Sequence, residues 1–179
     1  MQSTEATHGS RARSGSGPHD TVGPDIATDT SRLWAGAAVS VPLLVLASAA
    51  IGLLEKAPGH VATRWSTIAG SGPDAFGTPG DFLVEVGALT LVCTVISLLA
   101  IALVRDARAT ANILVFTTAV AAVSTAVWVT SVVLSMTTDD IETLSVESGA
   151  PPIVASMLWA AVPFVIMRAR ASRPAVSTV

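Results

Sequence analysis

The chain has 179 residues, of which 51% are hydrophobic and only 13% are charged, and its formal net charge at pH 7 is −3. Soluble domains carry about 25% charged residues, so this composition argues against a soluble globular protein and indicates a membrane protein. The net negative charge and the short basic stretches also argue against binding of nucleic acid by the chain.

The first segment, residues 1–31, is rich in Ser, Thr, Gly and Asp and has almost no large apolar side chains. Such a segment cannot bury enough apolar surface to offset the entropy lost on ordering. We therefore expect a disordered cytoplasmic tail. It is either a solubilising extension or a Ser/Thr-rich regulatory or docking segment.

Four apolar stretches follow, and only the second contains a charged side chain, Glu85. Their bounds are residues 33–54, 82–104, 111–136 and 151–167. Each is about long enough to cross the ~30 Å hydrocarbon core of a bilayer as an α-helix. The sequence therefore predicts an all-α integral membrane protein. We expect a four-helix antiparallel transmembrane bundle over residues 32–170 and a short cytoplasmic tail over residues 171–179.

The first stretch has features of both a membrane helix and a signal peptide. Ala47-Ser48-Ala49 resembles a small-residue cleavage site after an apolar run. The apolar run continues to Leu54 and the preceding tail is long, which favours an uncleaved span. Cleavage is the alternative, and it would leave three spans. Pro42 should bend this helix or be accommodated near its start.

The later stretches carry polar and proline signals. The short turn Arg105-Asp106-Ala107-Arg108 makes the second and third stretches antiparallel neighbours. In the third, Thr117, Ser124 and Ser131 recur every seven residues. Small polar residues of this kind either form interhelical hydrogen bonds or line a polar path, and both interpretations stay open. In the fourth, Pro163 lies deep in the span and predicts a kink.

The basic residues predict the orientation of the chain. The segments that we place in the cytoplasm carry Arg11, Arg13, Arg32, Arg105, Arg108, Arg168, Arg170 and Arg173. The opposite loops carry only Lys56 and Arg64. Because positive charge in short loops is retained in the cytoplasm, we predict a multi-pass plasma-membrane protein with both termini in the cytoplasm.

The residue types that catalysis requires are scarce. Cys93 is the only cysteine, so an intrachain disulfide is excluded, and His60 stands alone in a loop. The chain has no phosphate-binding loop and no metal-binding or nucleophile-base pattern. We therefore expect a protein that is not an enzyme and that uses no cofactor or metal.

The longest loop, residues 55–81, connects the first two spans on the extracytoplasmic side. Asp81 follows Pro79-Gly80 and is expected to cap the second helix. Glu85 comes four residues later on the same helical face. The positive end of the helix dipole favours both carboxylates at this terminus.

The same loop carries a motif-like set of residues: Pro58, Val61, Thr63, Trp65, Gly70 or Gly72, Pro73, Asp74, Phe76 and Gly77. With this set the chain resembles a bacterial membrane family of unknown function that also forms the N-terminal part of the sporulation-delaying-peptide immunity proteins. Arg64 and Ser66 stand where that family has His and Asn. The resemblance implies a loop with the same position between the first two membrane helices, and an immunity-like role.

The loop is thus either a compact cap on the outer membrane face or a docking surface. The candidate interaction residues are Thr63, Arg64, Trp65, Gly70, Pro73, Asp74, Phe76 and Gly77. The expected partners are the lipid bilayer and a peptide or membrane protein. We predict an accessory, sensor or immunity-like membrane protein. The alternatives are an oligomeric small transporter or channel subunit and a structural subunit of a larger complex. The oligomeric state is left open.

Overall fold

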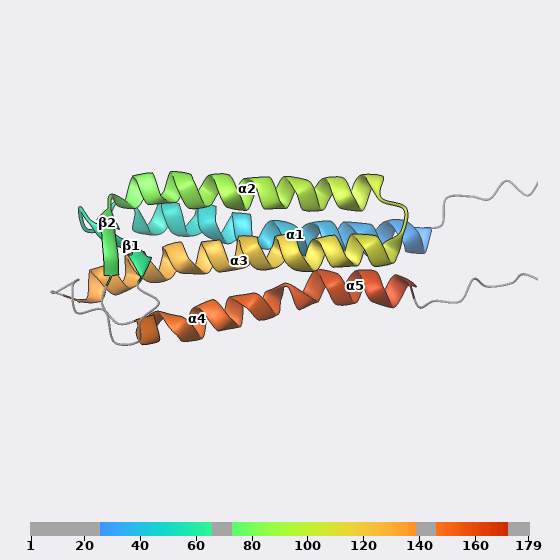
Figure 1. Ribbon diagram of the computed structural model, residues 1–179. Coiled ribbons are helices and arrows are strands. Elements are labelled where there is room, and N and C mark those ends of the chain that lie inside the picture. The colour runs from blue at the N-terminus through green and yellow to red at the C-terminus, as the bar shows by residue number, and fades with distance from the viewer. Residues whose placement is uncertain (1–25, 66–72, 139–145, 172–179) are drawn as a thin grey trace, which may run out of the picture.

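The structure is a computed structural model, and it describes residues 26–65, 73–138 and 146–171. The helices of these residues are α1 (Ile26–Leu53), α2 (Pro79–Leu103), α3 (Ala107–Thr137), α4 (Val146–Trp159) and α5 (Ala161–Ala171), and the strands are β1 (Val61–Trp65) and β2 (Pro73–Gly77). The helices run along a common direction, with the strands at one end (Figure 1). We call this the hairpin end. The other is the terminal end, where α1 begins and α5 finishes.

Four helical segments are long and apolar enough to cross a membrane. They are Thr30–Leu53, Pro79–Leu103, Ala107–Thr137 and Gly149–Ala169. The prediction of a multi-pass helical membrane protein is therefore confirmed at this level. The helix α1 begins at Ile26, so the last residues of the expected tail are helical. Residues 1–25 and 172–179, on which the rest of the two predicted tails falls, lie outside the described residues.

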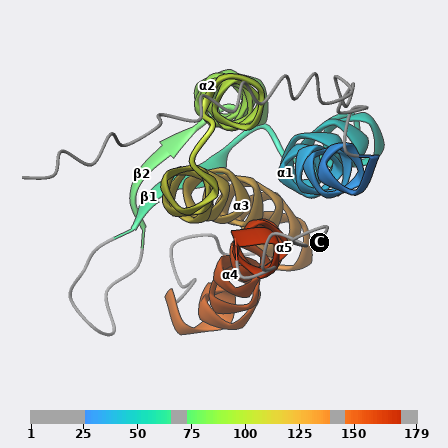
Figure 2. The same cartoon turned by 90° about the vertical axis from the view of Figure 1, so that its right-hand side faces the viewer.

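The helix α3 lies at the centre of the bundle and contacts each of the other four helices (Figure 2). Its turn to α2 is as short as predicted, because α2 ends at Leu103 and α3 begins at Ala107. The backbone N–H of Arg108 donates to the Asp106 carboxylate at 2.9 Å, so Asp106 caps the start of α3. The helices α2 and α3 thus form an antiparallel pair.

The start of α2 differs from the expected one. The N-cap is Thr78, and not Asp81, because the Thr78 hydroxyl accepts a 3.1 Å hydrogen bond from the backbone N–H of Asp81. The same hydroxyl donates to the Asp81 carboxylate at 2.7 Å. Pro79 occupies the first helical position, where no amide donor is required. Asp81 therefore supports the cap from the first turn, and Glu85 is exposed on the next turn.

The fourth span is broken, as Pro163 predicts. The helix α4 ends at Trp159, and α5 begins at Ala161. Proline lacks the N–H that would donate to the carbonyl four residues earlier, and its ring clashes with that carbonyl. For Pro163 that residue is Trp159, so the helix is interrupted directly after the carbonyl that loses its donor. On the terminal side of the break, α5 contacts α1. On the hairpin side, α4 leans away from α1 (Figure 1).

The expectation of a purely α-helical chain is wrong in the loop between α1 and α2. Here β1 and β2 form an antiparallel hairpin, in which Val61 pairs with Gly77 and Trp65 pairs with Pro73. The pairing is irregular on either side of Arg64. The segment Val61–Trp65 is rich in the β-branched and aromatic residues that favour strands. The loop is therefore an ordered structural element at its two flanks, while residues 66–72 lie outside the description.

Candidate functional site

The first strand of the hairpin is fastened to the helices. Val61 and Ala62 are both fully buried. Val61 belongs to an apolar cluster at the hairpin end with Leu46, Phe82, Val86, Trp128 and Val132. The indole Nε1–H of Trp128 donates a 3.2 Å hydrogen bond to the Pro79 carbonyl, which ties α3 to the first turn of α2. The hairpin is thus held against the bundle by its first strand.

The rest of the hairpin carries exposed side chains. They include Arg64, Asp74 and Phe76, and Phe76 is 44% exposed. Neither charged side chain forms an ion pair with another residue of the described segments. The strand β2 lies outside β1, because of the two strands it is β1 that packs on α3 (Figure 2). A cation, an anion and an aromatic ring are therefore exposed on the hairpin. Arg64 pairs with Ala75, and this pairing does not place Arg64 on the face that Asp74 and Phe76 share.

Two of the predicted loop residues shape the hairpin. The Thr63 hydroxyl donates a 3.3 Å hydrogen bond across the sheet to the Ala75 carbonyl. A Cβ atom added at Gly77 would lie 3.1 Å from Cγ2 of Thr63, so a side chain at position 77 would press against Thr63. Pro73 opens β2 and is half-buried. Gly70, also predicted, lies outside the described residues.

Trp65 faces the helices of the bundle. It is half-buried and lines a cavity of about 120 Å³ with Val127, Thr130, Ser131, Gly149 and Ile153. Its neighbour Arg64 is exposed. Of these two candidate interaction residues, only Arg64 is exposed. Trp65 instead covers the junction between α3 and α4.

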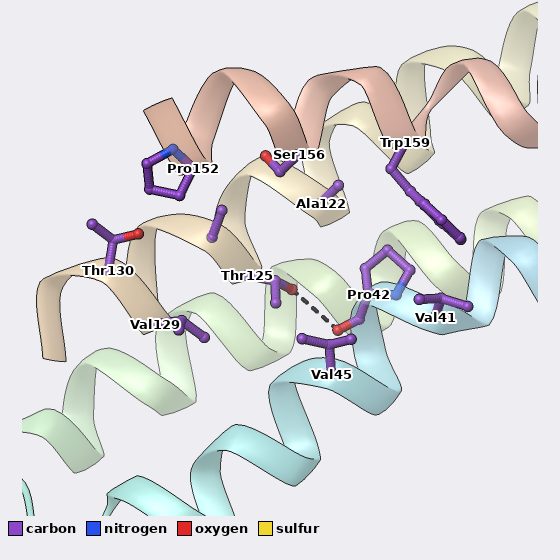
Figure 3. A pocket seen from close by; sticks show the side chains of 11 residues that line it. Val41, Pro42, Val45, Ala122, Thr125, Val129, Thr130, Pro152, Ser156 and Trp159 are labelled. Atoms are coloured by element: carbon purple, nitrogen blue, oxygen red, sulfur yellow. Dashed lines mark hydrogen bonds between the residues drawn. The ribbon is translucent and has the colours of Figure 1, made fainter. Parts of the chain in front are cut away.

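A larger cavity of about 320 Å³ lies between α1, α3 and α4 (Figure 3). Its lining consists of Val41, Pro42, Val45, Ala122, Thr125, Ala126, Val129, Thr130, Pro152, Ser156 and Trp159. Most of these side chains are apolar, and the Ser156 hydroxyl donates to the Ile153 carbonyl of its own helix. The cavity forms where α4 leaves α1, so it depends on the break after Trp159. No sequence pattern indicated it.

Pro42 is accommodated in the middle of α1 by contacts from the cavity walls. As proline it offers no N–H to the Ala38 carbonyl. The indole Nε1–H of Trp159 donates to that carbonyl at 3.1 Å. The Thr125 hydroxyl donates to the Pro42 carbonyl at 3.2 Å (Figure 3). The helices α3 and α4 are therefore both joined to α1 at its proline.

The polar stripe of α3 is directed into the bundle. Thr117 and Ser131 are buried, and Ser124 is half-buried. The hydroxyls of Thr117 and Ser97 are 2.7 Å apart and form a hydrogen bond between α3 and α2. Of the two interpretations given above, the contacts of Thr117 support interhelical hydrogen bonding.

The described residues contain no group of three or more His, Cys, Asp or Glu side chains that could hold a metal ion. Cys93 is a free cysteine, buried in α2. In comparisons with known proteins, no family model, no curated protein and no solved structure matches the chain. The family resemblance of the loop therefore stays a prediction that rests on the loop residues.

Proposed function

We propose that this chain is a non-enzymatic, multi-pass plasma-membrane protein of the accessory, sensor or immunity-like type. In this proposal the hairpin lies on the extracytoplasmic side and binds a peptide or a loop of another membrane protein. The single observation that supports it is a hairpin that is buried at the start of β1 and exposed along the rest of its length. Val61 and Ala62 are buried against the helices, while Arg64, Asp74 and Phe76 are exposed.

The arrangement suits recognition of an extended segment. A two-stranded sheet offers backbone N–H and C=O groups along its outer strand, and an added strand can pair with them. An exposed aromatic ring provides apolar area, and charges of both signs select a partner by complementarity. Because the hairpin is fastened at β1, its binding face is held in place before the partner arrives, which lowers the entropic cost of binding.

The proposed orientation rests on the distribution of arginine. Arg32, Arg105, Arg108 and Arg168 belong to the terminal end of the bundle, whereas Arg64 lies at the hairpin end. This asymmetry follows the positive-inside rule if the terminal end is cytoplasmic. The transport alternative requires a polar path. The two cavities beside α3 are lined mainly by apolar side chains, so we do not favour it.

The test is site-specific photocrosslinking in native membranes. A photoreactive amino acid at Phe76 should capture a partner at the exposed face of the hairpin. The matched control places the same group at Glu85, which is exposed on α2 near the hairpin end but outside the sheet. A partner recovered from position 76 and not from position 85 supports the proposal. Equal recovery from both positions, or recovery only from position 85, contradicts it.

A further inference from the structure

A groove with a volume of about 580 Å³ runs between α1 and α2 at the terminal end, away from the hairpin. Its walls include Gly36 and Ser40 of α1 and Leu98 and Ala102 of α2, and Arg32 lies at one end of it. From Arg32 to Ser40 the groove follows α1 for ~12 Å at ~1.5 Å rise per residue. That length stays within one leaflet, since the whole hydrocarbon core is ~30 Å thick.

The groove is apolar along its length. The Ser40 hydroxyl donates a 2.9 Å hydrogen bond to the Gly36 carbonyl of its own helix, so it offers no free donor to a ligand. A Cβ atom at Gly36 would meet Cδ2 of Leu98 only at 3.8 Å, an ordinary contact distance. A Cβ at position 36 would thus touch Leu98 without strain, and a larger side chain there would enter the groove between the two helices.

The end of the groove is different, because it carries a guanidinium group. The Nε atom of Arg32 is buried and has no hydrogen-bond partner within the described segments. A buried donor without an acceptor is unfavourable, so a ligand oxygen that reached this N–H after a small movement of the Arg32 side chain would add a hydrogen bond that the structure lacks. Guanidinium groups bind phosphate through paired N–H donors, one of which is Nε–H.

We propose that this groove binds an anionic phospholipid of the leaflet at the terminal end. The phosphate of the headgroup accepts hydrogen bonds from the Arg32 guanidinium, and one acyl chain lies along Gly36 and Leu98. Both parts of the site are then matched by one molecule, because a phospholipid joins an anion to an apolar chain. Basic sites between membrane helices on the cytoplasmic side are a known way to hold anionic headgroups.

Native mass spectrometry of the purified full-length chain tests this assignment. Phosphatidylglycerol and phosphatidylcholine with identical acyl chains are added at equal concentration, and the lipid-bound fractions are compared. Wild type should retain phosphatidylglycerol more strongly. Arg32→Gln should weaken phosphatidylglycerol binding by about tenfold or more, as expected for hydrogen bonds to a charged group. Gly36→Leu should weaken binding of both lipids, because the new side chain fills the groove.

The matched control is Arg105→Gln, which removes an exposed arginine in the turn after α2. It should leave phosphatidylglycerol binding within about twofold of wild type. Wild-type binding by Arg32→Gln overturns the proposal. So does an equal loss in Arg32→Gln and Arg105→Gln, because general attraction to the basic end would then explain the binding. Inorganic phosphate that displaces the lipid from Arg32 at equal concentration would identify an anion site without a lipid requirement, and would also overturn it.

Discussion

The indole of Trp159 donates its hydrogen bond to the Ala38 carbonyl, which is the group that Pro42 leaves without a helical donor. Trp159 and Pro42 are far apart in the sequence. The proline leaves a carbonyl without a donor, and the indole supplies a donor to the same carbonyl. A proline in the middle of α1 would expose an unpaired carbonyl to the apolar interior. The tryptophan at the end of α4 supplies the missing donor.

Removal of this donor should destabilise the fold more when Pro42 is present than when position 42 can donate an N–H. Trp159→Phe should lower the free energy of unfolding by about 1 kcal/mol, within the range measured for interhelical hydrogen bonds in membranes. In a Pro42→Ala background the backbone N–H of position 42 can donate to Ala38, so the same change should cost less. Unfolding in mixed micelles of the four variants gives the coupling energy. Equal effects of Trp159→Phe in both backgrounds would refute the relationship.

Gly149 should be required where α4 crosses α3. A Cβ atom there would lie 3.2 Å from Cγ2 of Thr130, closer than most real contacts. Gly149→Ala should therefore be less favourable than Gly87→Ala by about 1 kcal/mol, the lower end of the cost of overpacking. Gly87 is the matched control, since its nearest atom would be 4.0 Å away. Thr130→Ser removes Cγ2 and should abolish the difference, which thermal unfolding measures.

The cap of α2 should reside in Thr78 and not in Asp81. Thr78→Ala should cost about 1 kcal/mol of stability, and Thr78→Ser should cost little, because a hydroxyl is retained. Asp81→Asn keeps a hydrogen-bond acceptor and loses only the interaction of its charge with the helix dipole. This change should lower the free energy of unfolding by about 0.5 kcal/mol. A larger loss from Asp81→Asn than from Thr78→Ala, seen in the same unfolding assay, would restore the sequence-based prediction.

The orientation of the chain should be visible to a membrane-impermeant thiol reagent. In a Cys93→Ala background, Asp74→Cys should be labelled on intact cells, and Arg105→Cys should be labelled only after the membrane is opened. Both positions are exposed, one in β2 and the other in the turn after α2. The reverse pattern would place the hairpin in the cytoplasm and would exclude an extracellular partner for Phe76.

The hydropathy of the chain predicted the membrane-spanning segments because a bilayer requires long, apolar helices. Pro163 predicted the break in the fourth span because the effect of proline on a helix is local. The hairpin was not predicted because each of its strands is only five residues long, too short for a clear alternation of apolar and polar side chains. Thr78 was overlooked as a cap because Asp81 lies at the start of the apolar run.

The cavities could not be predicted at all. The cavity beside Pro42 depends on how far α4 leans from α1, and the groove at Arg32 depends on the spacing of α1 and α2. Both are properties of tertiary arrangement, whereas sequence patterns report on single elements. In the sequence, Arg32 is informative only as a positive charge that predicts the orientation of the chain. Its buried Nε atom became apparent from the packing around it.

The bend in the last span gives the molecule unequal cross-sections. At the terminal end α5 is packed against α1, and towards the hairpin end α4 stands apart from it (Figure 1). A body of this wedge shape displaces more lipid from one leaflet than from the other. Bilayers whose leaflets differ in lateral pressure or curvature therefore act unequally on its two ends, with the Ala160 break as the point where the profile changes.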